Sequence, residues 1–441
     1  MELNFSIDKK DAIIALGAES TGNFCVYDKG KIYFSEDFGD LLDEKNWENY
    51  KKIVLKYLKD NKIKPQIILT DLHPSFYTTL WGKQLAQKYK AKHIPIQHHH
   101  AHIFSAIGDK IIQNTKYQLP DTIYGIACDG TGYGLDGKIW GGEIFQVKSS
   151  KLKVKSISRM GHLENQTLIG GDLAVKEPAR MLISILDKVF SASSSPVIGR
   201  RCPVLRTGEG TSEREKKKKI YNIVKKHYSH NEFELLHNQL QQKFNCLETS
   251  SAGRILDAAS LLLGFCRNSR NYKHEPIDLL EKNSTKPYAD LKPKITSIKF
   301  ADSSLENSKF EIDSKFNPAK RDQNSKFILD TTDLFKYLIR NLHKDKKRLA
   351  ATAQLYLAEG IYEILQNIQN TKYQIQNTFF AGGIANNKII SDYLTSKGIY
   401  VSKKIHPVKF ERSETGKAVF NGVPRGDAGL SFGQVLYYLL S

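Results

Sequence analysis

The chain has 441 residues, and its 66 Lys and Arg against 47 Asp and Glu give a formal net charge of +19. This length allows about two or three domains, and 40% hydrophobic with 26% charged residues is typical of a globular protein. No apolar run approaches the roughly 18 residues of a membrane-spanning helix, and the N-terminus lacks a signal-peptide pattern. Five widely spaced cysteines without a CxxC pair indicate a reducing, cytoplasmic environment.

The first part of the chain alternates predicted strands and helices. An apolar run at 12–17 predicts a strand, and 24–34 alternates around a DKG turn as a hairpin does. A helix is predicted at 46–61, a buried strand at 65–74, then a second helix and a strand at 94–97. This order predicts an α/β layer.

The pattern then restarts with a glycine-rich hairpin at 122–147. Helices are predicted at 250–266 and 349–368, a strand, glycine turn and helix at 378–394, and a last helix from about 428 to 440. Two α/β parts that each open with a hairpin predict a duplicated fold with a cleft between its halves. Such clefts commonly bind ligands.

We place the first half at 1–118, with the C-terminal helix packing nearby, and the second half at 119–441. Two stretches break the pattern, at about 191–219 and 301–326, because they are polar or rich in Ser, Gly and charge, and we expect mobile insertions there. The lysine run at 216–219 favours a solvated surface over an RNA partner, because no aromatic residues are interleaved with it.

The densest group of reactive side chains is IPIQHHHAH, residues 94–102. If a helix begins near His98, then His98 and His102 lie on one face, one turn apart, as in chelating HxxxH pairs. His99 and His100 then point elsewhere and could hydrogen-bond a substrate carbonyl or phosphate. The same spacing also arises by chance in histidine clusters that bind nothing.

A metal site would need further ligands, and two aspartates are candidates. Asp129 ends an apolar strand before GTGYG, and Asp427 precedes the last helix. Carboxylates would suit a hard or borderline ion. Alternatively, Asp129 starts a turn and Asp427 is a helix N-cap.

Glycine turns form a second group of signals. DGTGYG (129–134) and AGG (381–383) follow apolar strands, where glycine lets backbone N–H groups approach a phosphate. AGGIANN also opens a helix, whose N-terminus favours anions. Each turn alone could be an ordinary hairpin turn, since neither is a Walker A or GxGxxG motif. The occurrence of two such turns favours a nucleotide in the cleft.

The stretch GGDLAVKEPARM (170–181) places Lys176, Glu177 and Arg180 at helical spacing. It could be a basic clamp for phosphate or carboxylate, or a salt-bridged surface turn. No GxSxG elbow or CGSCW-type signature occurs, which argues against a Ser or Cys hydrolase.

Taken in order, the motifs resemble one family. QHHHAH, DGTGYGLDGKIWGGE, GHL…GGD…EPAR, TSSAGRILDA, AGGIANN and GDAGLSFGQ, with GAES…FC and DLHPSF before them, are similar to the C-terminal carbamoyltransferase domain of HypF-type hydrogenase maturation proteins. The resemblance implies an actin-like, ribonuclease-H-like fold, which the family shares with tRNA threonylcarbamoyl-transferases and antibiotic O-carbamoyltransferases.

The resemblance also implies site residues. A divalent ion, for which Fe²⁺, Zn²⁺ and Mn²⁺ are all suitable, would be held by His98, His102, Asp129 and Asp427. ATP or carbamoyl-adenylate would lie at Gly130, Thr131, Gly132, Gly253, Asp257, Gly382, Gly383 and Asn387. Catalytic contacts would come from His99, His100, Arg180 and Glu275.

The implied reaction moves a carbamoyl group from carbamoyl-adenylate to the C-terminal cysteine of a HypE-like protein. Full-length members of the family carry acylphosphatase-like, zinc-finger and YrdC-like parts upstream. Since this chain begins at the transferase domain, we expect a separate YrdC-like protein to supply the adenylate.

The sequence departs from the family pattern in three places. Lys273 and His274 replace Glu and Gly in YEGEAA, Ala350 stands where a histidine is expected, and Gly426 replaces an Asn. These departures leave two alternatives open. One is carbamoyl or threonylcarbamoyl transfer to tRNA or a small-molecule hydroxyl, and the other is a degenerate nucleotide-binding partner protein.

Overall fold

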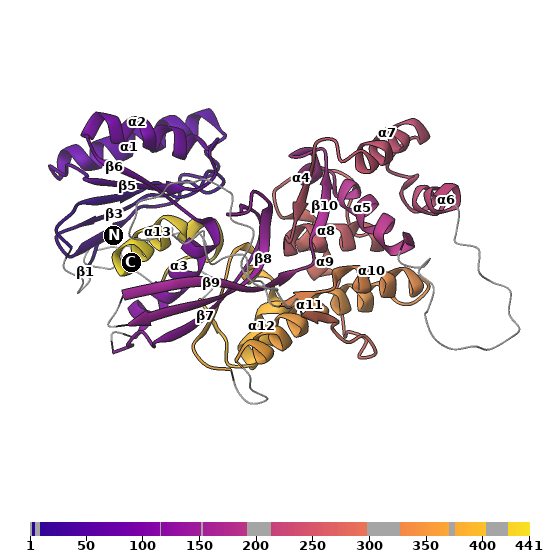
Figure 1. The fold of residues 1–441 in the computed structure, drawn as a ribbon. Helices are drawn as coiled ribbons and strands as arrows, with labels where there is room; N and C mark the ends of the chain where they lie inside the picture. Colours follow the sequence, from indigo (N-terminus) through magenta and orange to yellow (C-terminus); the bar gives the residue numbers. More distant parts are fainter. Residues whose placement is uncertain are drawn as a thin grey trace, which may run out of the picture. The chain divides into compact units, whose positions relative to one another are not determined.

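The computed structural model describes residues 2–4, 9–114, 116–150, 153–191, 213–297, 327–369, 375–402 and 422–441. The chain divides into two compact units (Figure 1). The first unit comprises residues 1–162, 298–326 and 365–441, and the second unit comprises residues 163–297 and 327–364.

A six-stranded sheet in the first unit has the order β1-β4-β3-β2-β5-β6. Its strands are β1 (Glu2–Asn4), β2 (Ile13–Ala15), β3 (Cys25–Asp28), β4 (Lys31–Phe34), β5 (Ile67–Asp71) and β6 (Lys92–Ile96). The central strand β2 pairs antiparallel with β3 and parallel with β5. Because side chains alternate across a strand, Ile14 faces the apolar cluster that includes α1 (Glu44–Asp60) and α2 (Tyr77–Tyr89), while Ile13 faces a second cluster.

A second sheet in the first unit contains the order β9-β8-β7-β14-β15. Its strands are β7 (Thr122–Tyr133), β8 (Ile139–Ser150), β9 (Lys153–Leu163), β14 (Thr378–Ala381) and β15 (Tyr400–Val401). The central strand β7 pairs antiparallel with β8 and parallel with β14. This arrangement repeats β4-β3-β2-β5-β6, so the predicted duplicated α/β fold is confirmed.

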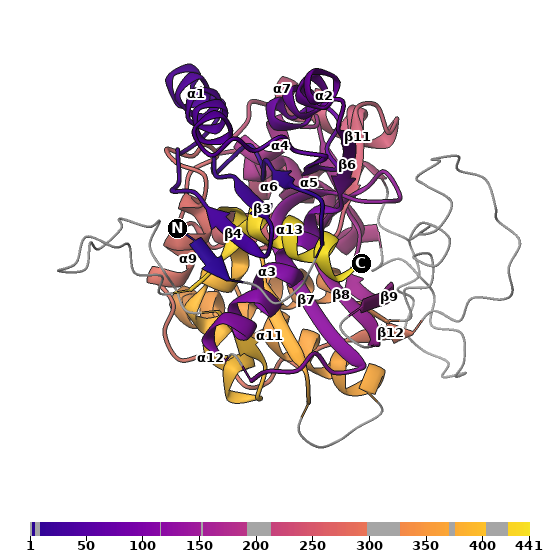
Figure 2. The same ribbon diagram turned by 90° about the vertical axis from the view of Figure 1, so that its left-hand side faces the viewer.

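Two helices lie between these sheets, α3 (His98–Gln113) and α13 (Leu430–Leu440), side by side in both views (Figures 1 and 2). α13 contacts β2, β3 and β5, whereas α3 contacts β7 and β14. The two helices pack closely at two glycines, with a backbone-to-backbone approach at Gly433 and a backbone-to-ring approach at Gly108. A Cβ added to Gly433 would lie 1.9 Å from the Ala101 carbonyl oxygen, and one added to Gly108 would lie 2.3 Å from the Phe432 ring.

The second unit is inserted between β9 and β14 and is mostly helical. Its elements are β10 (Gln166–Ile169), α4 (Leu173–Lys176), α5 (Pro178–Ser191), α6 (Glu213–Val224), α7 (His230–Gln241), β11 (Cys246–Thr249), α8 (Ala252–Leu263), α9 (Glu275–Lys282), β12 (Ile295–Ser297), β13 (Phe327–Leu329), α10 (Thr331–Arg340) and most of α11 (Lys346–Gln369). In the first unit, η3 (Gly383–Asn386) and α12 (Lys388–Ser396) follow β14, and η4 (Gly426–Gly429) precedes α13.

The predicted insertions fall partly outside the described residues, which omit 192–212 and 298–326. Residues 213–219 do not form a mobile insertion, because they begin α6. There the ammonium of Lys216 lies 3.0 Å from Asp187 and 2.9 Å from Glu213. The boundary near residue 118 stays a prediction. Among the described residues, no helix combines the length and apolar character needed to span a membrane.

The contact between α3 and α13 yields a prediction. Gly433→Ala should lower the free energy of unfolding by about 1–3 kcal/mol, because its new methyl group meets backbone atoms that cannot rotate away. Urea unfolding followed by circular dichroism measures the change. An unchanged urea midpoint and an unchanged slope would mean that α3 and α13 accommodate the methyl group without loss of stability.

Candidate metal centre

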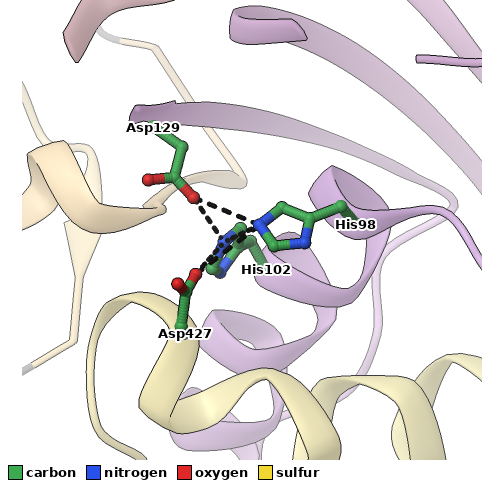
Figure 3. Close-up of side chains that lie close together, drawn as sticks. All are labelled: His98, His102, Asp129 and Asp427. Atoms are coloured by element: carbon green, nitrogen blue, oxygen red, sulfur yellow. Dashed lines mark hydrogen bonds and ion pairs between the residues drawn. The ribbon is translucent and has the colours of Figure 1, made fainter. Parts of the chain in front are cut away.

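Four side chains from distant segments meet in the first unit (Figure 3). His98 and His102 lie one turn apart at the start of α3, Asp129 belongs to β7, and Asp427 belongs to η4. The Asp129 Oδ2 atom is 3.2 Å from His98 Nε2 and 3.0 Å from His102 Nε2. Asp427 Oδ1 is 3.5 Å from the first of these nitrogens and 3.4 Å from the second. The structure thus brings together the four residues that the sequence proposes as ligands.

These separations fit a tetrahedral ion. Four bonds of about 2.0–2.1 Å in tetrahedral geometry separate the ligand atoms by about 3.3 Å. The two imidazole Nε2 atoms are 3.1 Å apart, and all four candidate ligand atoms lie within 4.8 Å of one another. Two nitrogens and two carboxylate oxygens suit Zn²⁺, Fe²⁺ or Mn²⁺.

A third carboxylate fixes the ring state of His98. Its Nδ1 lies 2.6 Å from Asp71 Oδ2, and both side chains are buried. A neutral His98 therefore carries its proton on Nδ1 and donates it to Asp71. This leaves the Nε2 lone pair facing His102 and Asp129, as metal-binding histidines require.

The electrostatics also favour a cation. Burial lowers the pKa of His98, but Asp71, Asp129 and Asp427 outweigh it and raise that pKa well above its usual value. Burial and Asp427 oppose ionisation of Asp129, yet bonds from His102 and His98 hold the pKa of that carboxyl far below its ordinary value. Protons and a metal ion therefore compete for the same nitrogens.

The segment that carries Asp427 needs a special backbone. Gly426 has φ +68°, in the left-handed region that glycine and asparagine adopt most readily. The Asn that the family pattern places here would keep this conformation, so the substitution does not disturb the centre. The Ser20 hydroxyl donates to Asp427 Oδ2, which orients the other carboxylate oxygen toward the histidines.

The glycine turns pack against the metal centre. A Cβ on Gly132 would lie 2.4 Å from the His99 ring and 3.0 Å from the His98 ring. A Cβ on Gly382 would lie 2.2 Å from the Cys128 carbonyl oxygen, and one on Gly383 would lie 2.8 Å from Asp129 Oδ1. These glycines are thus required for close packing, whether or not they also contact a phosphate.

The other proposed nucleotide contacts are divided between the units. In the first, the Gly130 amide donates to Asp129 Oδ1, Thr131 is exposed, and Asn387 caps α12 by accepting from the Ile390 amide. In the second, Gly253 lies in the first turn of α8, and Asp257 is buried between Arg254 at 3.0 Å and Arg270 at 2.9 Å. Asp257 is therefore an ion-paired core residue, and contact with a nucleotide stays a prediction.

The two remaining histidines of the motif occupy different surroundings. Gln97 caps α3, with its Oε1 accepting from the His100 amide and its Nε2 lying 3.0 Å from His99 Nδ1. The Gln97 amide therefore donates to Nδ1, and the His99 proton sits on Nε2, which has no hydrogen-bond partner within the described part of the chain. Burial lowers the pKa of His99 well below its usual value, so this N–H is a neutral donor.

His100 lies in the core. Its ring meets Phe145 edge-on at 5.1 Å between centroids and is 6.0 Å from the Tyr437 ring, and burial lowers its pKa to about 3. The substrate contact expected of His100 stays a prediction, and its ring lies beside two aromatic side chains.

Arg180 and Glu275 both belong to the second unit. The Arg180 Nε donates to Glu177 at 2.8 Å, and Glu275 accepts from the Asn271 side chain at 2.8 Å. The departures Lys273 and His274 are exposed next to Glu275. Ala350 is buried in α11. Neither Arg180 nor Glu275 belongs to the four-residue cluster, and their catalytic roles stay predictions.

Sequence reasoning missed Asp71 and Ser20 as parts of the centre. Both lie in motifs that carry the family resemblance, DLHPSF and GAES. Asp71 could have been found in the sequence. A metal-binding histidine usually donates its other ring N–H to a carboxylate, and Asp71 ends the buried strand β5.

The described residues contain one further group of this kind, Asp187, Glu213 and His237 in the second unit. The Lys216 ammonium already contacts both carboxylates. A resident cationic side chain thus occupies the place that a metal would take.

Comparisons with known proteins match most of the chain to HypF proteins. Residues 125–434 match the family described as Carbamoyltransferase, Kae1-like Domain, second subdomain, and residues 8–109 match the HypF Kae1-like domain. The probable carbamoyltransferase HypF of Methanocaldococcus jannaschii is 32% identical over 440 residues, covering 99% of this chain and 47% of that protein. A carbamoyltransferase HypF homolog of Cupriavidus necator is 31% identical over 252 residues, covering 57% of this chain and 55% of its own.

Solved structures show the same fold. T. kodakarensis HypF superposes with a TM-score of 0.70 at 26% identity, over 99% of this chain and 48% of that one. Full-length HypF in the phosphate- and nucleotide-bound form superposes with a TM-score of 0.72 at 22% identity, over 99% of this chain and 56% of that one. The chain thus spans about half the length of these relatives.

The first prediction from this geometry concerns metal content. Purified His102→Ala should lose the bound ion, because it removes one of the four ligand atoms that face one point. His100→Leu is the matched control, since His100 lies on the same helix but outside the cluster. Metal analysis by mass spectrometry compares both with the unaltered protein. Equal metal content in His102→Ala would reject the site.

A second prediction concerns Asp71. Asp71→Asn should weaken metal binding by about 10–100-fold, because the amide cannot hold the His98 ring and raise its basicity as the carboxylate does. A Zn²⁺ competition titration measures the affinity. Unchanged affinity would show that the His98 ring needs no such partner.

Proposed function

Because the chain belongs to the HypF carbamoyltransferase family, we propose that it transfers a carbamoyl group from carbamoyl-adenylate to the C-terminal cysteine of a HypE-like protein in nickel–iron hydrogenase maturation. The convergence of His98, His102, Asp129 and Asp427 is the observation that carries the proposal. A divalent ion bound there would polarise the carbamoyl oxygen and offset the negative charge that develops on it.

The residues of this chain would bind and orient the reactants. The four proposed ligand residues would hold the ion, and Asp71 would keep the His98 lone pair directed toward it. Among the residues that the structure describes, the His99 Nε2 proton has no hydrogen-bond partner, so it can donate to a carbonyl or phosphate oxygen. An unpaired buried donor costs about 1–3 kcal/mol, and such a bond would offset this cost.

The attacking sulfur would come from the acceptor. Burial raises the thiol pKa of all four described cysteines, Cys25, Cys128, Cys246 and Cys266. These thiols therefore form thiolates poorly at neutral pH. In the proposed step, the acceptor thiolate forms a bond to the carbamoyl carbon, the bond from that carbon to the phosphate oxygen breaks, and AMP leaves with the electron pair.

A nucleotide ligand fits the same proposal. The HypF structure of similar fold was solved in a nucleotide-bound form, and carbamoyl-adenylate is itself a nucleotide. We assign its phosphate to the first-unit glycine turns at 130–132 and 382–383, which adjoin the proposed metal ligands. The adenylate would be supplied by a YrdC-like protein or domain.

Transfer to tRNA is less well supported. Among the lysines of the run at 216–219, Lys216 and Lys217 make ion pairs with acidic side chains of the second unit. Paired lysines release fewer counterions from a nucleic acid and add less to binding.

A transfer assay tests the proposal. The purified chain is incubated with ATP, carbamoyl phosphate and a HypE-like acceptor, with and without a YrdC-like protein. We expect the acceptor mass to rise by one carbamoyl group only in the mixture that contains the YrdC-like protein. His102→Ala should abolish the shift, and an acceptor without its terminal cysteine should show none. Absence of the shift from both mixtures would refute the proposed transfer.

A further inference from the structure

Asp427 reaches the metal centre at the end of a short irregular stretch. Residues 422–425 form no helix or strand, and η4 begins at Gly426. A ligand on such a stretch can meet the histidines only if its backbone is fixed, because a displacement of about 1 Å would break coordination.

The helix that carries the histidines also carries an anchor for this stretch. Asp109 lies on α3, seven residues and about two turns beyond His102, and is 1% exposed. Its Oδ1 accepts the Val423 backbone N–H at 2.8 Å, and its Oδ2 accepts the Tyr400 hydroxyl at 2.8 Å. Both carboxylate oxygens are therefore used, and one holds the backbone four residues before Asp427.

Arg425 fixes the same stretch from the other side. Its Nη1 donates to the Ala385 carbonyl at 2.6 Å in η3, and its Nε donates to the Ser402 carbonyl. Beyond Asp427, the Asn23 side chain donates to the Ala428 carbonyl. Asp109 differs from these anchors because it shares one rigid helix with His98 and His102.

We propose that Asp109 is a positioning residue that sets Asp427 at the metal centre, so that α3 fixes the distance between two ligands of its own and a third more than 300 residues away. The inference rests on the proposed metal site. Asp109 would contact neither the ion nor a substrate. It acts through the Val423 amide, and its removal should loosen one ligand and leave the histidines in place.

A double-mutant cycle on Co²⁺ binding separates this role from a merely structural one. Asp109→Ala should weaken Co²⁺ binding by about 10–100-fold, as loss of an outer-shell partner does, and should change the visible spectrum because one carboxylate ligand is lost. In an Asp427→Asn background the same change should alter the affinity by no more than about twofold, because the ligand it positions is already impaired.

Tyr400→Phe is the matched control. It removes the second hydrogen bond to Asp109 but leaves the bond to Val423, so it can lower the unfolding temperature while Co²⁺ affinity stays within about twofold. If Asp109→Ala does not fold, Asp109→Ser replaces it, since its side chain is one heavy atom shorter and keeps a polar group.

The outcomes are distinct. Equal weakening by the Asp109 variant in both backgrounds would mean that the aspartate supports α3 as a whole, and would overturn the inference. Unchanged affinity in the otherwise unaltered protein would overturn it as well. If instead the unaltered protein and His102→Ala bind Co²⁺ equally, the metal site itself fails.

Discussion

Two buried carboxylates and one half-buried carboxylate beside two buried imidazoles set the main constraint on this fold. Ionised carboxylates are costly to bury unless positive charge and hydrogen bonds compensate them. Asp71, Asp129 and Asp427 all point at the imidazoles of His98 and His102. In the absence of an ion, the two rings can supply only protons, which is why the pKa of each is raised despite burial. A divalent cation supplies more charge at the same point, and its ligand separations match those in the structure.

The duplicated topology explains how these groups meet. Central strands β2 and β7 occupy equivalent places in the two sheets of the first unit. β2 leads to the loop whose Ser20 bonds Asp427, and β7 carries Asp129 near its end. The neighbouring parallel strands are equivalent too, since β5 ends at Asp71 and β14 leads to Gly383, which touches Asp129. Both halves thus present the carboxyl ends of corresponding strands to one centre, where α/β folds commonly bind ligands.

The sequence predicted the duplicated fold because each half opens with a hairpin and continues with alternating elements. It proposed four ligands through an i, i+4 histidine pair and the family resemblance, whereas spacing alone left Asp129 and Asp427 open. Asp71 was missed because its meeting with His98 depends on the parallel pairing of β5 and β6. The surroundings of His100 could not be predicted, because α3 is buried on all sides near its start and the spacing of the histidines does not show which side chains each ring meets. The second unit escaped detection because its helices have ordinary apolar patterns and because the first compositional break, at about 191–219, comes only after β10, α4 and α5 of that unit.

The departures from the family pattern separate according to the unit in which they occur. Gly426 lies in the first unit, where φ +68° admits glycine and asparagine alike, so the exchange keeps the backbone that carries Asp427. Lys273 and His274 are exposed in the second unit, ahead of α9, and change the charge there. Ala350 removes a polar side chain from the buried part of α11. Apart from Gly426, these departures thus fall in the second unit, and all four candidate ligand residues of the first unit are retained.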